Sequence, residues 1–288
     1  VQLYGLAVRG PLSAEEGASG SAIIVSGSGT FKLVQSTVSA PAGHGVELTG
    51  AGSDAAVISG VTFDAVRDSA LHATDALGSW TVEGNLCRGP LGGHAMAFAG
   101  GDADVTLRNN TFGDFPRDGE EEAPAINGSA LHASNVLGSW TVEGNLCRGP
   151  IGGDGISFAG GSAEAQVTLR NNTFEQVDGN GISAQDALGS WTVEGNLCRG
   201  PIGGHAMHFH NQSGAISLNN NSITGSARGV LVNGGSAAWT ITGNRVLGTG
   251  PSQGPRGGFE FVDLTAEGTL NCTGNTLNHV GGLAMSFK

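Results

Sequence analysis

Three blocks of this 288-residue sequence are nearly identical, and they restrict the fold more than any other feature. The blocks span 77–98, 137–158 and 188–209, and each begins LGSWTVEGNLCRGP. Between them lie two VTLRNNTF segments, at 105–112 and 167–174, which share with the blocks the pattern apolar-x-apolar-x-(Gly/Asn)-Asn-x-apolar. Self-similarity at a fixed period is typical of solenoids, in which each repeat buries its apolar face against its neighbours. The sequence therefore predicts one repetitive domain, although its length alone would suggest two.

The second Asn of this pattern recurs about every 24 residues and sets the length of one coil. This spacing gives about eleven coils in a single domain spanning 1–288, with longer insertions near 114–128 and 248–256. An Asn at a turn bonds neighbouring backbone and tolerates left-handed dihedrals, so we expect the equivalent asparagines to stack as a structural ladder. The members are Asn85, Asn110, Asn145, Asn172, Asn196, Asn221, Asn244 and Asn275, preceded in the same slot by Leu6, Ser36 and Val61.

Alternation of apolar and polar residues predicts two strands in each coil. Apolar residues stand five and three positions before the Asn slot, as Trp80 and Val82 do before Asn85, with polar residues between them. A second alternating segment, such as 96–98, follows a Gly-Gly or similar turn. Period two marks a strand with one buried face, and coils stacked about 4.8 Å apart pair such strands in parallel. Because the sequence lacks the strict hexapeptides of left-handed β-helices, we expect an all-β, right-handed, single-stranded parallel β-helix.

These residues, such as TVEGNL at 81–86, resemble the parallel β-helix repeat of the pectin-lyase-like superfamily, x-Ile/Val-x-Gly-Asn-x-Ile. In that repeat a short loop and then Gly-Ile-x-Ile follow. The resemblance covers nearly the whole chain and is specific for the fold rather than for an activity. The superfamily includes polysaccharide lyases, glycoside hydrolases, epimerases, phage tailspikes, adhesins and large surface proteins, so the resemblance leaves both enzymatic and structural functions open.

Cysteines and tryptophans fall in apolar columns of the repeat. Cys87, Cys147 and Cys198 lie two residues after the Asn slot, and Cys272 occupies another apolar column. The three equivalent cysteines lie on alternate coils, about 10 Å apart, whereas a disulfide spans at most roughly 7 Å between Cα atoms. We therefore expect four buried free thiols. The tryptophans share a column with aliphatic residues, which predicts core packing rather than a sugar-binding platform. They are Trp80, Trp140, Trp191 and Trp239.

The outward positions of the first strand form two ranks. One rank is mostly Thr, from Thr81 to Thr240, and the other alternates in charge. Opposite charges on neighbouring strands stabilise modestly, by about 0.2–1 kcal/mol each, and they fix the register of the coils. A Thr rank is also a feature of ice-binding solenoids, but those carry paired Thr ranks. The predicted charge ladder is Glu83, Arg108, Glu143, Arg170 and Glu194.

Candidates for catalysis and for metal binding are few. A glycosidase needs two carboxylates facing one groove roughly 5–10 Å apart, and no stack of acidic residues on adjacent coils is visible. The remaining candidates are Asp154, His205 and His208 for catalysis, and His208 with His210 for a metal, although a metal site requires three or four ligands. We expect His94 and His205, at the turn before that strand, to be surface residues. The sequence thus favours a non-catalytic protein without a metal or other cofactor.

Charge and sequons indicate the surroundings of the protein. The net charge is −12 with no basic cluster, which argues against nucleic acid because its binding depends on Lys and Arg. No stretch approaches the length of a membrane span. Asn-x-Ser/Thr sequons favour a secreted, glycosylated protein that is extracellular or at the cell surface. The six are at Asn109, Asn127, Asn171, Asn211, Asn220 and Asn271.

The ends of the sequence carry no recognisable cap. An open solenoid end exposes unpaired strand edges that invite association. We therefore expect a part of a longer solenoid, or units that associate end to end, with other extracellular structural proteins and glycans as further partners. The favoured function is an extracellular structural or adhesive solenoid within a surface filament, coat or large surface glycoprotein. The alternatives are a polysaccharide lyase or glycoside hydrolase, and a carbohydrate-binding or ice-binding module.

Overall fold

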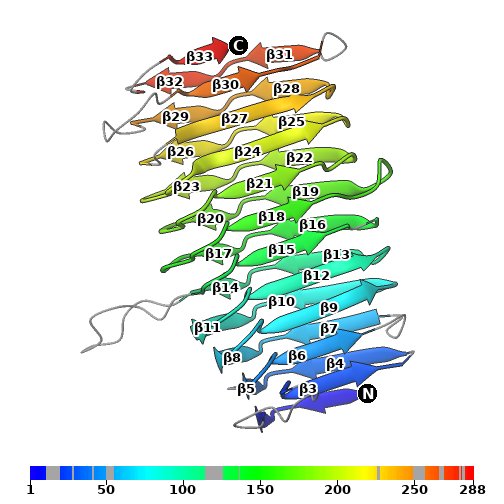
Figure 1. Ribbon diagram of the computed structural model, residues 1–288. Helices are drawn as coiled ribbons and strands as arrows, with labels where there is room; N and C mark the ends of the chain where they lie inside the picture. The colour runs from blue at the N-terminus through cyan, green and yellow to red at the C-terminus, as the bar shows by residue number, and fades with distance from the viewer. Residues whose placement is uncertain are drawn as a thin grey trace, which may run out of the picture.

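The computed structural model of the chain is an elongated stack of coils built from three parallel sheets, with the two termini at opposite ends (Figure 1). The structure describes residues 1–10, 20–27, 29–40, 42–49, 55–113, 126–135, 137–225, 228–248, 257–265, 269–278, 280 and 283–288. Each sheet has 11 strands in the described chain, and each strand pairs with the strand three places away in the sequence. Three consecutive strands therefore form one coil, and we number the coils 1 to 11 from the N-terminus. None of the described residues forms a helix long and apolar enough to cross a membrane.

The first sheet contains β1 (Gln2–Tyr4), β4 (Thr30–Val34), β7 (Ala55–Ser59), β10 (Ser79–Glu83), β13 (Asp104–Arg108), β16 (Ser139–Glu143), β19 (Gln166–Arg170), β22 (Ser190–Glu194), β25 (Ile216–Asn219), β28 (Trp239–Thr242) and β31 (Leu270–Thr273). The second sheet contains β2 (Ala7–Arg9), β5 (Thr37–Ala40), β8 (Thr62–Val66), β11 (Leu86–Leu91), β14 (Thr111–Phe112), β17 (Leu146–Cys147), β20 (Thr173–Phe174), β23 (Leu197–Arg199), β26 (Ser222–Thr224), β29 (Arg245–Leu247) and β32 (Thr276–Asn278). The third sheet contains β3 (Ile23–Ser26), β6 (Val46–Thr49), β9 (Leu71–Ala76), β12 (Met96–Gly101), β15 (Leu131–Ser134), β18 (Ile156–Ala159), β21 (Ile182–Gln185), β24 (His205–Gln212), β27 (Arg228–Gly235), β30 (Phe259–Val262) and β33 (Met285–Phe287).

These sheets confirm the all-β parallel solenoid and its coil count, but the expectation of two strands per coil was wrong. The strands of the second sheet, which follow the Asn slot directly, were not predicted. Several of them are two residues long, such as β14 and β17. A pair of residues cannot display a period of two, so sequence alternation does not reveal such a strand. The expected insertion near 114–128 falls mostly outside the described residues, and the one near 248–256 does so except for Gly248.

The chain turns from the first sheet into the second through one residue with left-handed backbone dihedrals. Its φ is 55° at Asn109, 65° at Gly144 and 55° at Asn171. Glycine has no Cβ to clash in this region, and Asn is the side chain that tolerates it best. This requirement explains the Gly-Asn and Asn-Asn dipeptides that follow the first-sheet strands of coils 4 to 11.

The core alternates between two kinds of coil. Coils 4, 6 and 8 place a tryptophan on the first sheet, a cysteine on the second and a phenylalanine on the third, whereas coils 5 and 7 place valine, phenylalanine and alanine at the same positions. Because the girth of the coil is fixed, a large side chain on one sheet requires a small one on another. The core residues of coils 4 to 8 are Trp80, Cys87, Phe98, Val105, Phe112, Ala133, Trp140, Cys147, Phe158, Val167, Phe174, Ala184, Trp191, Cys198 and Phe209.

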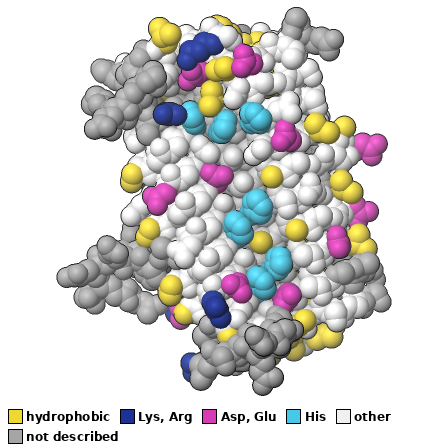
Figure 2. Space-filling view, in the orientation of Figure 1, with side chains coloured by type: hydrophobic (Ala, Val, Ile, Leu, Met, Phe, Trp, Pro, Cys, Tyr) yellow, Lys and Arg dark blue, Asp and Glu magenta, His cyan; other side chains and the backbone are white. Residues whose placement is uncertain are grey.

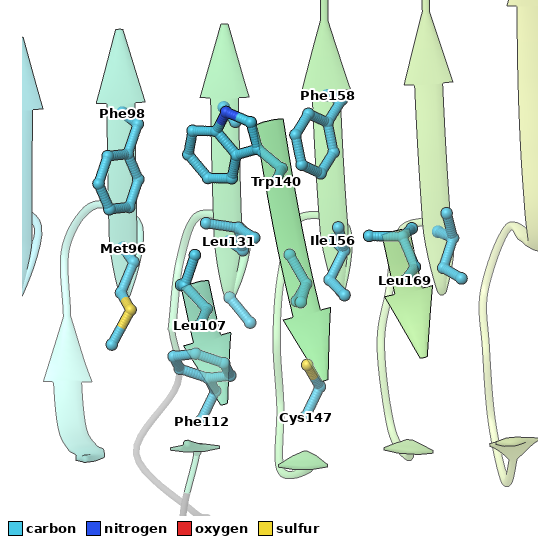
Figure 3. Close-up of a cluster of buried hydrophobic side chains, with 14 of the residues drawn as sticks. Met96, Phe98, Leu107, Phe112, Leu131, Trp140, Cys147, Ile156, Phe158 and Leu169 are labelled. Atoms are coloured by element: carbon cyan, nitrogen blue, oxygen red, sulfur yellow. The ribbon is translucent and has the colours of Figure 1, made fainter. Parts of the chain in front are cut away.

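Tryptophans and phenylalanines of the even-numbered coils meet along the axis of the solenoid. The ring centroids of Phe98 and Trp140 lie 5.0 Å apart and those of Trp140 and Phe158 5.3 Å apart, both at 88°. Figure 3 shows these three rings in succession, with Phe112 and Cys147 on another side of the core, below them in the view. Edge-to-face contacts add about 0.5–1.5 kcal/mol each to the burial of the rings. All four tryptophans are therefore core residues, at most 3 % exposed.

Candidate functional site

The asparagines of the repeat form a buried hydrogen-bonded ladder between the first and second sheets, here called the Asn corner. In coil 6 the Asn145 amide nitrogen donates to Asn172 Oδ1 at 3.0 Å. Asn145 Nδ2 donates to Asn172 Oδ1 at 2.9 Å and to the Leu107 carbonyl oxygen at 3.1 Å. The same bonds repeat from Asn85 to Asn244, and these side chains are at most 2 % exposed. Each coil is thus tied to both neighbours at this corner.

The charged rank on the first sheet divides into two ion pairs. Arg108 Nε lies 2.5 Å from Glu83 Oε2, and Arg170 Nε lies 3.3 Å from Glu194 Oε2. Glu143 lies in register between the two arginines but makes no ion pair in the part of the chain that is described. The five residues of the expected charge ladder are in register, but they form two separate ion pairs rather than one continuous series. Half-exposed pairs of this kind stabilise by about 0–1 kcal/mol each.

The second sheet carries a charged rank that the sequence analysis missed. Arg88 Nη2 lies 3.4 Å from Asp64 Oδ2, and Arg199 pairs with Glu175. All four residues stand three positions after the Asn slot. The alternation of charge at this position is visible in the sequence. It predicts ion pairs between coils only if a strand is expected after the Asn slot, and none was.

Three of the four cysteines are buried thiols with no partner cysteine. Cys87, Cys147 and Cys198 are 0 % exposed, and burial raises the pKa of each thiol, that of Cys198 to about 12. A thiol with a raised pKa is protonated at neutral pH and is a poor nucleophile. Cys272 departs from the expectation of burial, because it lies half-buried in the last coil. Burial raises its pKa as well.

Asp154, His205 and His208 lie on the third-sheet side of coils 6 and 8. Asp154 and His205 share one column, but Asn180 of coil 7 stands between them. Asp154 Oδ1 accepts bonds from the Asn180 amide nitrogen at 2.6 Å and from Asn180 Nδ2 at 3.0 Å, and Asn180 Oδ1 accepts from the His205 amide at 2.9 Å. The His208 ring lies 5.5 Å from that of His205. The carboxylate of Asp154 is therefore engaged in joining two coils.

Paired carboxylates are the feature that a glycosidase on this fold would use. Neighbouring coils lie about 4.8 Å apart, so in-register carboxylates would have nearly the separation of a retaining pair, about 5–5.5 Å. In the registered strand pairs of the described chain, no carboxylate faces another carboxylate.

The described histidines all lie on the third sheet or at the turn before it, and Figure 2 shows them in a row along this face. Two pairs of rings are in contact across coils: His44 with His72 at 4.4 Å, and His94 with His132 at 4.7 Å and nearly parallel. The sequence analysis did not recognise either pair, because the two members belong to different columns. The seven described histidines are His44, His72, His94, His132, His205, His208 and His210.

His94 and His205, which the sequence placed at the surface, are both partly exposed and partly buried. Burial lowers the pKa of each to about 4, with neighbouring His132 lowering that of His94 and neighbouring His208 that of His205. The suggested metal ligands His208 and His210 have ring centroids 6.4 Å apart. Nowhere in the described ranges do three His, Cys, Asp or Glu side chains gather as a metal site requires.

A second axial ladder, which the sequence analysis missed, runs along the turn between the second and third sheets. We call it the turn column. At each step the amide nitrogen of one coil donates to a side-chain acceptor of the preceding coil, as Ser129 does to His94 Nδ1 at 2.9 Å and Asp154 to Ser129 Oγ at 3.1 Å. The signal in the sequence is a polar residue two positions before the first inward apolar residue of the third-sheet strand in coils 2 to 8, as Ser129 stands before Leu131 and His205 before Met207. The members are His44, Ser69, His94, Ser129, Asp154, Asn180 and His205.

All six sequon asparagines are exposed. Three of them, Asn109, Asn171 and Asn220, occupy the left-handed position at the Asn corner of coils 5, 7 and 9. A Cβ built on Gly144 of the next coil would lie 2.7 Å from Asn109 Oδ1, and the glycines after Asn171 and Asn220 are equally restricted. A residue other than glycine would have to displace the asparagine side chain, and the positive φ of these glycines also disfavours a Cβ.

Three parallel sheets, one short strand of each per coil and an internal asparagine ladder define a parallel β-helix. The family described as the right-handed β-helix region matches residues 21–286, and the chain belongs to this family. The match also agrees with the right-handed coil expected from the sequence. No curated protein and no solved structure matches the chain.

Proposed function

We propose that this protein is an extracellular structural or adhesive solenoid that holds repeated surfaces and glycans at fixed intervals along a stiff axis. The observation that carries the proposal is the axial use of its polar side chains. At two of the three corners these side chains join one coil to the next, and on two sheets the charged residues do the same. Such bonds stabilise the length and register of the solenoid.

The exposed sequons support the extracellular part of the proposal. Asn109, Asn171 and Asn220 follow one another along a single corner, about 10 Å apart at a spacing of two coils. Glycans there would form a ridge beside the Thr rank of the first sheet, whereas the sequon at Asn211 lies in β24 of the third sheet. The partners that fit this arrangement are other structural proteins and glycans of the same compartment.

The alternative proposal is an enzyme that cleaves polysaccharides. One observation favours it: Asp154 and His208 are close enough for the carboxylate to raise the pKa of the imidazole, against a larger lowering by burial. A carbohydrate-binding module is favoured less, because the large aromatic side chains exposed in the described chain are Tyr4 and Phe287, at opposite ends.

The test is to secrete the full chain from a eukaryotic host, map its glycans by mass spectrometry and incubate it with neutral and acidic polysaccharides. We expect occupied sequons at Asn109, Asn171 and Asn220 and no release of new sugar ends. The matched control is Thr111→Val, which removes the first sequon, keeps its asparagine and should lose one glycan. Unoccupied sequons would contradict the extracellular assignment. Polysaccharide cleavage that disappears in Asp154→Asn would replace the structural assignment with the enzymatic one.

A further inference from the structure

Two histidines of the turn column are hydrogen-bond acceptors for backbone amides. Ser69 donates to His44 Nδ1 at 3.1 Å, and Ser129 donates to His94 Nδ1 at 2.9 Å. An imidazole nitrogen that accepts a bond carries no proton, so both rings must be neutral with the hydrogen on Nε2. This tautomer also leaves Nε2 without a lone pair for a metal, so the two rings cannot bind one and keep these bonds.

The other side chains that accept bonds in the column accept through oxygen. Ser69 and Ser129 accept through hydroxyl oxygens, and Asn180 accepts through an amide oxygen. Asp154 accepts through a carboxylate oxygen. The links made by His44 and His94 are thus chemically different from the links that Ser69, Ser129, Asp154 and Asn180 make in the same column.

We propose that His94 is a proton-sensitive latch in the turn column. A proton on Nδ1 converts the acceptor into a donor that faces the Ser129 amide, so the link between coils 4 and 5 must open. The acceptor of the link between coils 7 and 8, Asn180 Oδ1, is an amide oxygen and gains no proton under the same conditions.

The groups around His94 add positive charge to its surroundings in acid. The ring of His94 stacks on that of His132 and also lies near His72, so its surroundings contain imidazoles that become cationic in acid. Carboxylates oppose this effect at both neighbours, since Glu47 and Asp68 raise the pKa of His72 and Asp154 raises that of His132. Burial is the larger cause at both rings and lowers the pKa of each.

The direction of the pH effect follows from the lowered pKa of His94, about 4 in the closed turn because of burial. In the open turn the group regains its ordinary pKa of about 6.5. The open state therefore binds more protons between these values, and it becomes more populated as the pH falls through 6.5 towards 4. Since the ring is half-exposed, we expect the opening constant to rise roughly 10- to 40-fold between pH 6.5 and 4.5.

Amide hydrogen exchange of the full chain, corrected for the intrinsic effect of pH, tests the proposal. The protection factor of the Ser129 amide should fall at least tenfold from pH 6.5 to 4.5. That of the Asn145 amide, which donates to Asn172 Oδ1 at the Asn corner, should change less than twofold. Equal losses at both amides, or no loss at Ser129, would overturn the latch.

Two variants make the test specific to the imidazole. His94→Asn copies the acceptor found at Asn180 and should keep the Ser129 amide protected at pH 4.5. Asn180→His places a second imidazole acceptor in the column and should make the protection of the His205 amide fall more steeply with pH than in the parent chain. If Ser129 loses protection in His94→Asn as it does in the parent chain, the titration belongs to another group and the proposal is wrong.

Discussion

The Asn corner and the turn column both provide hydrogen-bond acceptors for backbone amides where a coil changes direction, and both join neighbouring coils. They differ in the side chains that they use and in the direction of the bonds. At the Asn corner the amide of one coil donates to the side chain of the following coil, whereas in the turn column it donates to the side chain of the preceding coil. The Asn side chain also donates to a carbonyl, so it needs both an acceptor and a donor. The turn column needs an acceptor alone.

This difference explains why one corner is uniform and the other is mixed. A short side chain that holds both an acceptor and a donor in one plane is the Asn amide. Asn fills this slot in eight coils and is buried in seven of them. Serine, histidine, aspartate and asparagine all supply an acceptor, so each occurs in the turn column. The Asn corner is therefore uniform because each of its positions must both accept and donate. The turn column needs only an acceptor, so a titratable group such as an imidazole can occupy it.

The largest expected effect comes from breaking the Asn corner. Asn145→Ala leaves the amide and Nδ2 of Asn110 without their acceptor and the Leu107 carbonyl without its donor. At about 1–3 kcal/mol for each buried unsatisfied group, we expect the free energy of unfolding to fall by about 3–5 kcal/mol in denaturant titrations. Asn109→Gly, on an exposed residue of the preceding coil, is the control and should be nearly neutral.

The second largest effect tests the core of the sheet between the two corners. Cys147→Phe places a large side chain in a coil that already holds Trp140 and Phe158, and overpacking of this kind costs about 1–3 kcal/mol. The melting temperature should fall more than in Cys147→Ala, which removes only a sulfur. A fully stable Cys147→Phe chain would contradict the alternation of large and small side chains.

A smaller effect is expected for the turn column. Ser129→Ala removes the acceptor of the Asp154 amide and should lower the free energy of unfolding by about 1 kcal/mol. The matched control is Ser157→Ala on the outward face of β18, for which we expect no measurable change. A loss as large as that of Asn145→Ala would mean that the two corners contribute equally.

The smallest effect is expected on the charged rank of the first sheet. Glu143→Gln removes a carboxylate that makes no ion pair in the described structure, and the free energy of unfolding should change by less than about 0.5 kcal/mol. Glu83→Gln removes the partner of Arg108 and should cost slightly more, with the difference lost in 1 M salt. A salt-independent cost at Glu143 would indicate that the rank acts as one unit.

The sequence was sufficient for the fold because its strongest signals are periodic. The Asn slot gave the coil length, and the columns around Trp80 and Phe98 identified strands of the first and third sheets. The second sheet was not predicted, because strands such as Thr111–Phe112 are too short to show an alternation of apolar and polar residues. The turn column was not predicted either, because its members share a function as hydrogen-bond acceptors but differ in residue type, so no residue repeats at this position.

Contacts between side chains of different columns could not be predicted from the sequence either. His94 and His132 are 38 positions apart and occupy different slots of the repeat, yet their rings stack because one ends a turn and the other begins the outward face of the next coil. The pairing depends on how far each ring reaches along the axis. The division of the charged rank into two pairs has the same origin, since register places Glu143 equally beside two arginines.

The alternating core limits how a solenoid of this kind can be lengthened during evolution. Hydrogen bonds repeat every coil, but the arrangement of large and small core side chains repeats every second coil. Duplication of one coil would place two tryptophan coils, or two valine coils, in direct succession. A gene that encodes such a chain should therefore gain or lose coils in pairs, and the near-identical blocks at 77–98, 137–158 and 188–209 lie on coils 4, 6 and 8.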